Sequence, residues 1–160
     1  MASGKPASHA ATKVLAVNRK ATHDYTVLER FEAGIELVGT EVKVLRNGEG
    51  GLMGAWCKVE AGQLWLMQVR IPPYAFGTHF NHEALRTRRL LMHRKEILRL
   101  RIKLEQKGLS LIPLKLYLNP RGRVKVELAL CQGKDQYDRR ETVKRREADR
   151  AAQRAMRLSR

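Results

Sequence analysis

The chain has 160 residues, with 32 lysines and arginines against 16 acidic residues, for a formal net charge of +16. A positive field this strong on a chain of this length favours a polyanionic partner, and charge alone leaves RNA, DNA and an anionic membrane surface open. No apolar run approaches the ~20 residues of a membrane span, and residues 1–13 lack the apolar stretch of a secretory signal. The two cysteines, Cys57 and Cys131, are too few for a disulfide framework or a zinc site, so we interpret them as buried thiols of a cytoplasmic protein.

A basic cluster, Arg19 and Lys20, stands beside His23 and Asp24 near the start of the chain. The 12 residues at the N-terminus are mostly small or polar, and we interpret residues 1–12 as a disordered arm. A histidine beside an aspartate suits a nucleophilic system, but three of the four serines lie in terminal segments. We therefore interpret the cluster as a cationic surface.

Short strands bounded by turns occupy most of the middle of the chain. A strand-like run at residues 25–31 is interrupted by Gly34 and resumes at 35–38. Further strands are predicted at residues 52–59, 64–71, 109–118 and 124–130, with turns at 47–51, 60–62 and 119–122. The last strand alternates strictly between apolar and polar residues, which is typical of a half-buried antiparallel strand.

A short helix is predicted where the first strand region ends. Thr40 offers an N-cap hydroxyl, and Glu41 lies in the first turn, where a negative charge suits the helix dipole. The helical spacing predicts one buried face made of Val38, Val42 and Leu45. Another face presents two cations to water, Lys43 and Arg46.

Two later segments carry ambiguous patterns. Residues 74–89 interleave aromatic and basic side chains, which suits base stacking and phosphate contact, although an ordinary loop tied down by Phe76 and Phe80 is the alternative. Residues 93–107 fit both a strand and a helix. We predict a helix, because most of these residues are strong helix formers and Gly108 suits the position after a helix.

These elements predict a mainly β domain with short helices at residues 13–132, arranged as a small closed antiparallel barrel. The composition then changes at Gly133. Residues 133–160 carry ten basic and five acidic residues, with an apolar stripe of helical spacing made of Ala148, Ala151, Ala152, Ala155 and Met156. Because alanine favours a helix but buries little area, we expect a tail that is disordered alone and helical against RNA. A solvated helix docked on the barrel is the alternative.

No catalytic constellation stands out. His79 and His82 are spaced to reach a metal, but no third ligand is apparent, so a loop is the simpler interpretation. The glycine-rich run at residues 48–51 follows a helix instead of a strand, unlike a phosphate-binding loop. Glu36 and Glu41 suit a magnesium-dependent nuclease, although solvation and the helix dipole explain them more simply. We therefore expect a protein that is not an enzyme and has no cofactor and no metal site.

Four motifs resemble the SsrA-binding protein family, also called small protein B. They are NRKATHDY at residues 18–25, FEAGIELVGTEVKVLR at 31–46, RTRRLL at 86–91 and GKDQYDRRE at 133–141. They follow the family's order and spacing, and the resemblance runs from residue 14 into the tail. It implies an oligonucleotide-binding-type barrel that binds transfer-messenger RNA in ribosome rescue. It further implies a ribosome partner whose empty messenger channel takes the tail, and elongation factor Tu through the aminoacylated RNA, with neither membrane nor DNA as partner.

The resemblance also implies which residues make these contacts. The RNA-binding positions are Asn18, Arg19, Lys20, His23, Glu32, Glu41, Lys43, Arg46, Arg88, Arg89 and Met92. The tail positions at the ribosome are Lys134, Tyr137, Asp138, Arg139, Arg140, Lys144, Arg145, Arg146 and Met156. Three positions depart from the family's usual residues: Met92 replaces leucine, Arg139 replaces lysine, and Trp56 replaces tyrosine, which we interpret as core packing. The alternative to this function is a structural ribosomal or other RNA-binding protein with a barrel and a basic tail.

Overall fold

The computed structural model describes residues 13–79, 81–106, 108–134 and 136–158, but not the side chains of residues 136–139. Several expectations therefore lie outside the described residues. They are the disordered arm at residues 1–12, the anchoring role of Phe80, and the ribosome contacts of Tyr137, Asp138 and Arg139.

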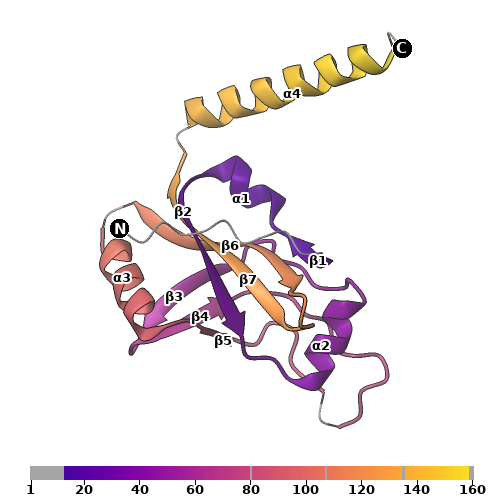
Figure 1. Cartoon of the computed structure of the whole chain (residues 1–160), viewed down its shortest axis with the longest axis vertical. Helices are drawn as coiled ribbons and strands as arrows, with labels where there is room; N and C mark the ends of the chain where they lie inside the picture. The colour runs from indigo at the N-terminus through magenta and orange to yellow at the C-terminus, as the bar shows by residue number, and fades with distance from the viewer. Residues whose placement is uncertain (1–12, 80, 107, 135, 159–160) are drawn as a thin grey trace.

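In the described residues, seven antiparallel strands form one sheet with a ring-like arrangement (Figure 1). Their bounds are β1 Lys13–Val17, β2 Tyr25–Ile35, β3 Trp56–Glu60, β4 Gln63–Met67, β5 Arg88–Leu91, β6 Leu109–Leu118 and β7 Val124–Gly133. The order is β1-β6-β3-β4-β5-β2-β7, and an additional β6–β7 pairing closes the ring. The predicted closed antiparallel barrel is confirmed.

Within the part of the chain that the structure describes, four helices accompany the strands: α1 Arg19–Asp24, α2 Gly39–Arg46, α3 Arg94–Leu104 and α4 Gln136–Leu158. The helix predicted at residues 93–107 is confirmed by α3, which buries Ile97 and Leu100 against the barrel. Neither β1 nor α1 is predicted from the sequence, because each is too short to show a period of its own. α1 owes its start to Asn18, whose side-chain oxygen accepts a hydrogen bond from the backbone N of Ala21 at 3.2 Å.

The apolar side chains form two clusters. The larger one fills the barrel and includes Leu64, Leu66 and Val126. The smaller one lies between α1 and the β6–β7 pair, where Ala21 packs with apolar residues of both strands. α1 therefore covers an outer face of the barrel wall, which explains why this part of β7 is buried on both faces.

Two predicted elements and one predicted core residue differ from the structure. β2 continues through Gly34, because that residue pairs with both β7 and β5 and a Cβ there would lie 3.2 Å from the Cβ of Leu91. β5 begins inside residues 74–89, for which no strand was predicted, because its pairing with β4 and β2 stabilises a strand with no pattern of its own. The core role predicted for Trp56 is also wrong. Its side chain is 41% exposed on the outer face of β3.

α2 begins at Gly39, so Thr40 is inside the helix instead of at its N-cap. Its buried face consists of Glu41, Val44 and Leu45, whereas Val38 is exposed. Of the predicted face, Leu45 is buried, Val42 is half-buried and Val38 is exposed, and the buried Glu41 takes a place that an apolar residue was expected to fill.

The tail forms α4, which projects away from the barrel (Figure 1). This differs from the expectation of a tail that is disordered without RNA. The described side chains from Arg140 to Leu158 are mostly exposed, including the alanine stripe and Met156. The tail contacts α1, where the Lys134 Nζ donates to the backbone O of Thr22 at 3.1 Å and Arg146 Nη2 donates to the Thr22 Oγ1 at 3.3 Å.

Candidate nucleic-acid interface

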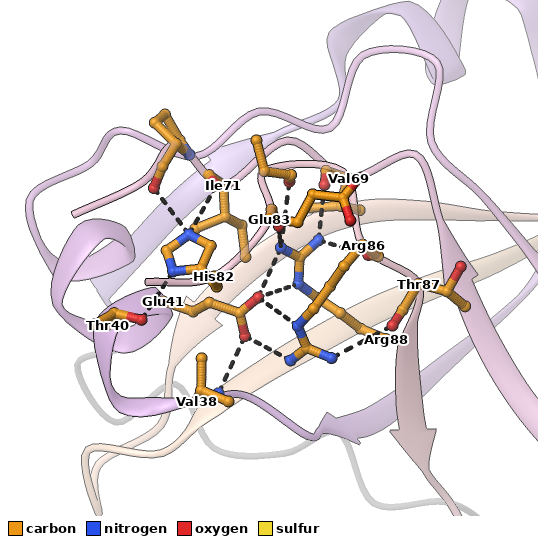
Figure 2. Close-up of polar contacts among 12 residues, drawn as sticks. Val38, Thr40, Glu41, Val69, Ile71, His82, Glu83, Arg86, Thr87 and Arg88 are labelled. Atoms are coloured by element: carbon orange, nitrogen blue, oxygen red, sulfur yellow. Dashed lines mark hydrogen bonds and ion pairs between the residues drawn. The ribbon is translucent and has the colours of Figure 1, made fainter. Parts of the chain in front are cut away.

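A buried carboxylate connects α2 to the RTRR motif (Figure 2). The Glu41 side chain has no exposed surface. Its Oε1 accepts hydrogen bonds from Arg86 Nε at 2.9 Å and Arg88 Nε at 2.8 Å. Its Oε2 accepts from Arg86 Nη2 at 2.8 Å and from the backbone N of Val38 at 3.1 Å. We call Glu41, Arg86 and Arg88 the Glu41 network.

The two arginines keep Glu41 ionised although it is buried. Burial by itself raises the pKa of Glu41, but the hydrogen bonds from Arg86 and Arg88 outweigh it and hold that pKa below its ordinary value. Arg88 is also fully buried, and its Nη1 donates to the backbone O of Val69 at 2.8 Å and of Arg86 at 3.0 Å. The buried charges are therefore paired, and their remaining donors are satisfied.

His82 connects α2 to Ile71 and Pro72 in the loop between β4 and β5 (Figure 2). Its Nε2 lies 2.9 Å from the backbone O of both Ile71 and Pro72, so this nitrogen carries the proton and donates. Its Nδ1 then accepts from the Thr40 hydroxyl at 2.8 Å. With both ring nitrogens engaged, His82 anchors the loop as a hydrogen-bonding residue, in line with the simpler interpretation of the histidine pair.

These contacts correct two predicted RNA contacts. Arg88 and Glu41 lie inside the fold, so neither presents a donor or acceptor to a phosphate. Arg89, the next residue, lies on the opposite face of β5, where its side chain is 41% exposed and its Nε donates to Glu36 at 2.9 Å. The RTRR motif therefore divides between a buried structural arginine and a surface arginine.

An aromatic and cationic surface lies over α2 and the loop between β4 and β5, which the Glu41 network supports. The Lys43 Nζ lies 5.3 Å from the centre of the Tyr74 ring, and Tyr74 meets Phe76 edge to face with ring centres 5.7 Å apart. Phe76 is 84% exposed, so it does not tie the loop down. That task falls to Asn81, whose side chain bonds the backbone N and O of Tyr74 at 3.1 and 2.9 Å. The exposed ring and cation are the arrangement that base stacking and phosphate contact use.

A second cationic surface lies on α1. Arg19 and Lys20 are exposed, while Asn18 is buried, donating from Nδ2 to the backbone O of Pro113 at 3.1 Å. Asn18 therefore fixes the position of the helix that carries the cations. His23 Nδ1 lies 2.8 Å from Asp24 Oδ1 at the end of the same helix.

Glu32 and Met92 lie elsewhere on the barrel. The exposed Glu32 accepts a hydrogen bond from the hydroxyl of Tyr117, a partner that the sequence gives no means of finding. Burial and this bond raise the pKa of Tyr117 above its ordinary value, which keeps the hydroxyl protonated. Met92 is half-buried and packs on the core. Arg46 is exposed at the end of α2, where its Nη2 approaches the backbone O of Gly122 at 3.5 Å.

The described part of the tail presents mainly cations. Arg140, Lys144, Arg145 and Arg146 are exposed along α4. Within the described ranges, no helix is long and apolar enough to cross a membrane, and no group of three or more histidine, cysteine, aspartate or glutamate side chains is arranged for a metal ion.

The family profile described as SmpB protein matches residues 15–158. This chain belongs to the SmpB family. The SsrA-binding protein of Desulforamulus reducens is 54% identical over 153 residues, which cover 96% of this chain and 95% of the relative. That of Moorella thermoacetica is 54% identical over 145 residues, covering 91% and 94%.

A solved structure agrees with these relatives. It is described as "tmRNA-SmpB: a journey to the center of the bacterial ribosome", and one of its chains matches with a TM-score of 0.64 at 47% identity. The match covers 79% of this chain and 92% of that chain. Membership of the family and the oligonucleotide-binding-type barrel predicted from the motifs are both confirmed.

Proposed function

We propose that this chain binds transfer-messenger RNA and delivers it to stalled ribosomes in trans-translation, as a binding protein that catalyses no reaction. The observation that carries the proposal is the family assignment. The relatives at 54% identity are SsrA-binding proteins, and the matched structure is described as tmRNA-SmpB in the bacterial ribosome. The proposal puts the chain in the cytoplasm, where the ribosomes are.

The exposed cations of α1 and α2 are the proposed phosphate contacts. Arg19, Lys20, Lys43 and Arg46 are all exposed and carry no ion pair among the described residues, so an approaching phosphate has no carboxylate to displace. The buried Glu41 network supports this function indirectly, because it fixes α2 and the adjoining loop in one position.

The tail is proposed to occupy the empty messenger channel of the ribosome. Residues 140–158 carry seven basic and three acidic residues, and these charged side chains are exposed. A cationic helix with a face of small alanines suits close contact with RNA. In this mechanism the aminoacylated RNA arrives with elongation factor Tu, and the tail takes the place of codon pairing.

Sequencing the RNA that co-purifies with the chain tests the proposal. The chain is purified twice. The first preparation uses a low salt concentration that leaves most of the chain on ribosomes, and the second is made after the ribosomes have been dissociated. We expect one dominant small RNA of the transfer-messenger type in both preparations. Retention on salt-washed ribosomes at one copy each, with ribosomal RNA alone, would instead identify a structural ribosomal protein.

A further inference from the structure

A hollow of about 870 Å³ opens at the edge of β6, between α1, β3 and the end of α3. It exists because β6 divides one edge between two partners. β1 pairs with the far end of β6 from Lys115 onward, whereas β3 pairs with β6 only between Cys57 and Leu111. The strands therefore separate around this single pairing. The volume lies within the ~300–1,000 Å³ range of ligand sites.

Trp56 gives the hollow an aromatic wall. Its indole is 41% exposed, and on the outer face of β3 it pairs across the strands with Met67. Among the described residues, neither another ring nor a cation stacks on it. An exposed indole costs hydrophobic free energy unless something covers it, so a flat apolar ligand is the natural occupant.

Cations from three separate elements line the same hollow as this ring. Lys20 comes from α1, Lys58 from β3 and Arg101 from α3. Lys58 and Arg101 hold exposed partners, Glu60 at 2.8 Å and Glu105 at 3.6 Å, and such surface pairs exchange readily for a phosphate. Lys20 has no ion-pair partner in the described ranges.

The hydrogen-bonding groups on the wall complete the site. Ser110 lines the hollow, and a hydroxyl can both donate to and accept from the edge of a base. Of the two acids on the lining, Asp24 lies 2.8 Å from His23, and Glu105 is 67% exposed, so its carboxylate turns to water when a phosphate takes its place on Arg101. An apolar ring, a hydroxyl and three cations match a nucleotide, which combines a flat base with a phosphate.

We propose that the hollow receives one unstacked nucleotide of the bound RNA, with its base against Trp56 and its phosphates between Lys20 and Arg101. The inference rests on the proposed function and names a subsite of the same RNA surface, because Lys20 belongs to both. A protein partner is the less favoured occupant, since the chain carries +16 and the wall presents three cations.

Tryptophan fluorescence tests the stacking directly. The chain has two tryptophans, so Trp65→Phe leaves Trp56 as the sole indole emitter. The probe is the transcribed transfer-like domain of transfer-messenger RNA. We expect saturable quenching of Trp56 and its protection from acrylamide at the RNA concentrations that give binding.

Affinity measurements separate the ring from the fold. Stacking on an aromatic side chain is worth ~1–3 kcal/mol per base, so Trp56→Ala should weaken binding of the RNA domain about 5- to 140-fold, whereas Trp56→Phe should stay within about threefold. The double change Lys20→Ala with Arg101→Ala should lower the salt slope by roughly 0.7 for each phosphate that the variant no longer neutralises. Arg94→Ala, an exposed cation of α3 outside the hollow, is the matched control and should leave affinity and slope unchanged.

Each outcome decides between the two proposals. If the wild-type chain binds the RNA domain while Trp56 emission is unchanged and Trp56→Ala binds equally well, the hollow is not the subsite and the proposed function stands. If the wild-type chain does not bind the RNA domain, both proposals fail. If Trp56→Ala lowers the unfolding temperature, its affinity no longer tests the stacking. The fluorescence of Trp65→Phe and the affinity of the double charge variant then decide whether the hollow binds RNA, because both proteins keep the Trp56 ring.

Discussion

Replacing Glu41 by glutamine isolates the contribution of the Glu41 network to stability. The substitution keeps the size and one acceptor oxygen but removes the charge that compensates two arginines. Arg88 has no exposed surface, so its charge stays buried without its ionised partner. Removing one member of a buried pair costs ~3–5 kcal/mol, and the retained acceptor places Glu41→Gln near the lower end, at about 3 kcal/mol.

Thermal unfolding followed by circular dichroism measures this cost. For a domain of this size, about 3 kcal/mol corresponds to a fall in unfolding temperature of roughly 10–15 °C. The matched control is Glu36→Gln, which removes the same charge from an ion pair with Arg89 at 2.9 Å where Glu36 is 58% exposed. A surface pair of this kind contributes ~0–1 kcal/mol, so the control should shift the unfolding temperature by less than about 4 °C.

Equal unfolding temperatures for Glu41→Gln and Glu36→Gln would refute the structural role of the network. RNA affinity gives a second criterion. At a temperature where both variants are folded, Glu41→Gln should bind RNA like the wild-type chain if Glu41 acts only inside the fold. A large loss of affinity in the fully folded variant would show that the charge of Glu41 is needed for RNA binding itself, through the position of α2 and the adjoining loop that it fixes.

Four further outcomes are expected. Folding lowers the pKa of Glu41, so its ionisation stabilises the fold fully at pH values above the ordinary glutamate pKa of about 4.3. The difference in unfolding free energy between wild type and Glu41→Gln should therefore be constant near neutrality and shrink as pH falls through the pKa of the folded state. A difference that grows in acid would contradict this sign. Truncation after Lys134 should leave the unfolding temperature and RNA binding nearly unchanged but abolish peptide tagging on stalled ribosomes, whereas normal tagging would exclude the tail as the sensor. Glu32→Gln should weaken RNA binding about tenfold with the fold intact, and Tyr117→Phe should reproduce part of that loss if the tyrosine orients the carboxylate; unchanged binding by both would remove this position from the interface. RNA affinity should fall steeply with salt, and Lys43→Ala should reduce the slope of log affinity against log salt by about 0.7–0.9, so an unchanged slope would exclude that phosphate contact.

Local patterns determined several elements correctly because their signals do not depend on distant partners. The alternation of residues 124–130 predicts a strand with one buried face, and β7 buries Val124, Val126 and Leu128. β7 continues to Gly133, which pairs with Tyr25, so the barrel extends slightly past the predicted boundary at residue 132. The turn predicted at residues 60–62 joins β3 to β4 with positive φ at both Ala61 and Gly62, the geometry that tight hairpins require.

The candidate site was predictable only in its residue types. The sequence places arginines and glutamates at the GTEVKVLR and RTRR motifs, and the exposed cations of α1 and α2 follow from it. Which members are buried does not follow, because ion pairs between Glu41 and Arg88 join positions 47 residues apart. The same holds for the Tyr117 partner of Glu32, which is 85 residues away. No local pattern carries information across such distances.

The sequence by itself therefore determined the class of the fold, the family and the cationic character of the surface, since these depend on composition, period and motif order. The tertiary structure alone decided which of two adjacent arginines faces the interior. Successive residues of a strand point to opposite faces, and the pairing of β5 between β4 and β2 turns Arg88 inward and Arg89 outward. The same pairing turns Arg88 toward the carboxylate of Glu41, and a shift of one residue in that register would exchange the buried arginine for the exposed one.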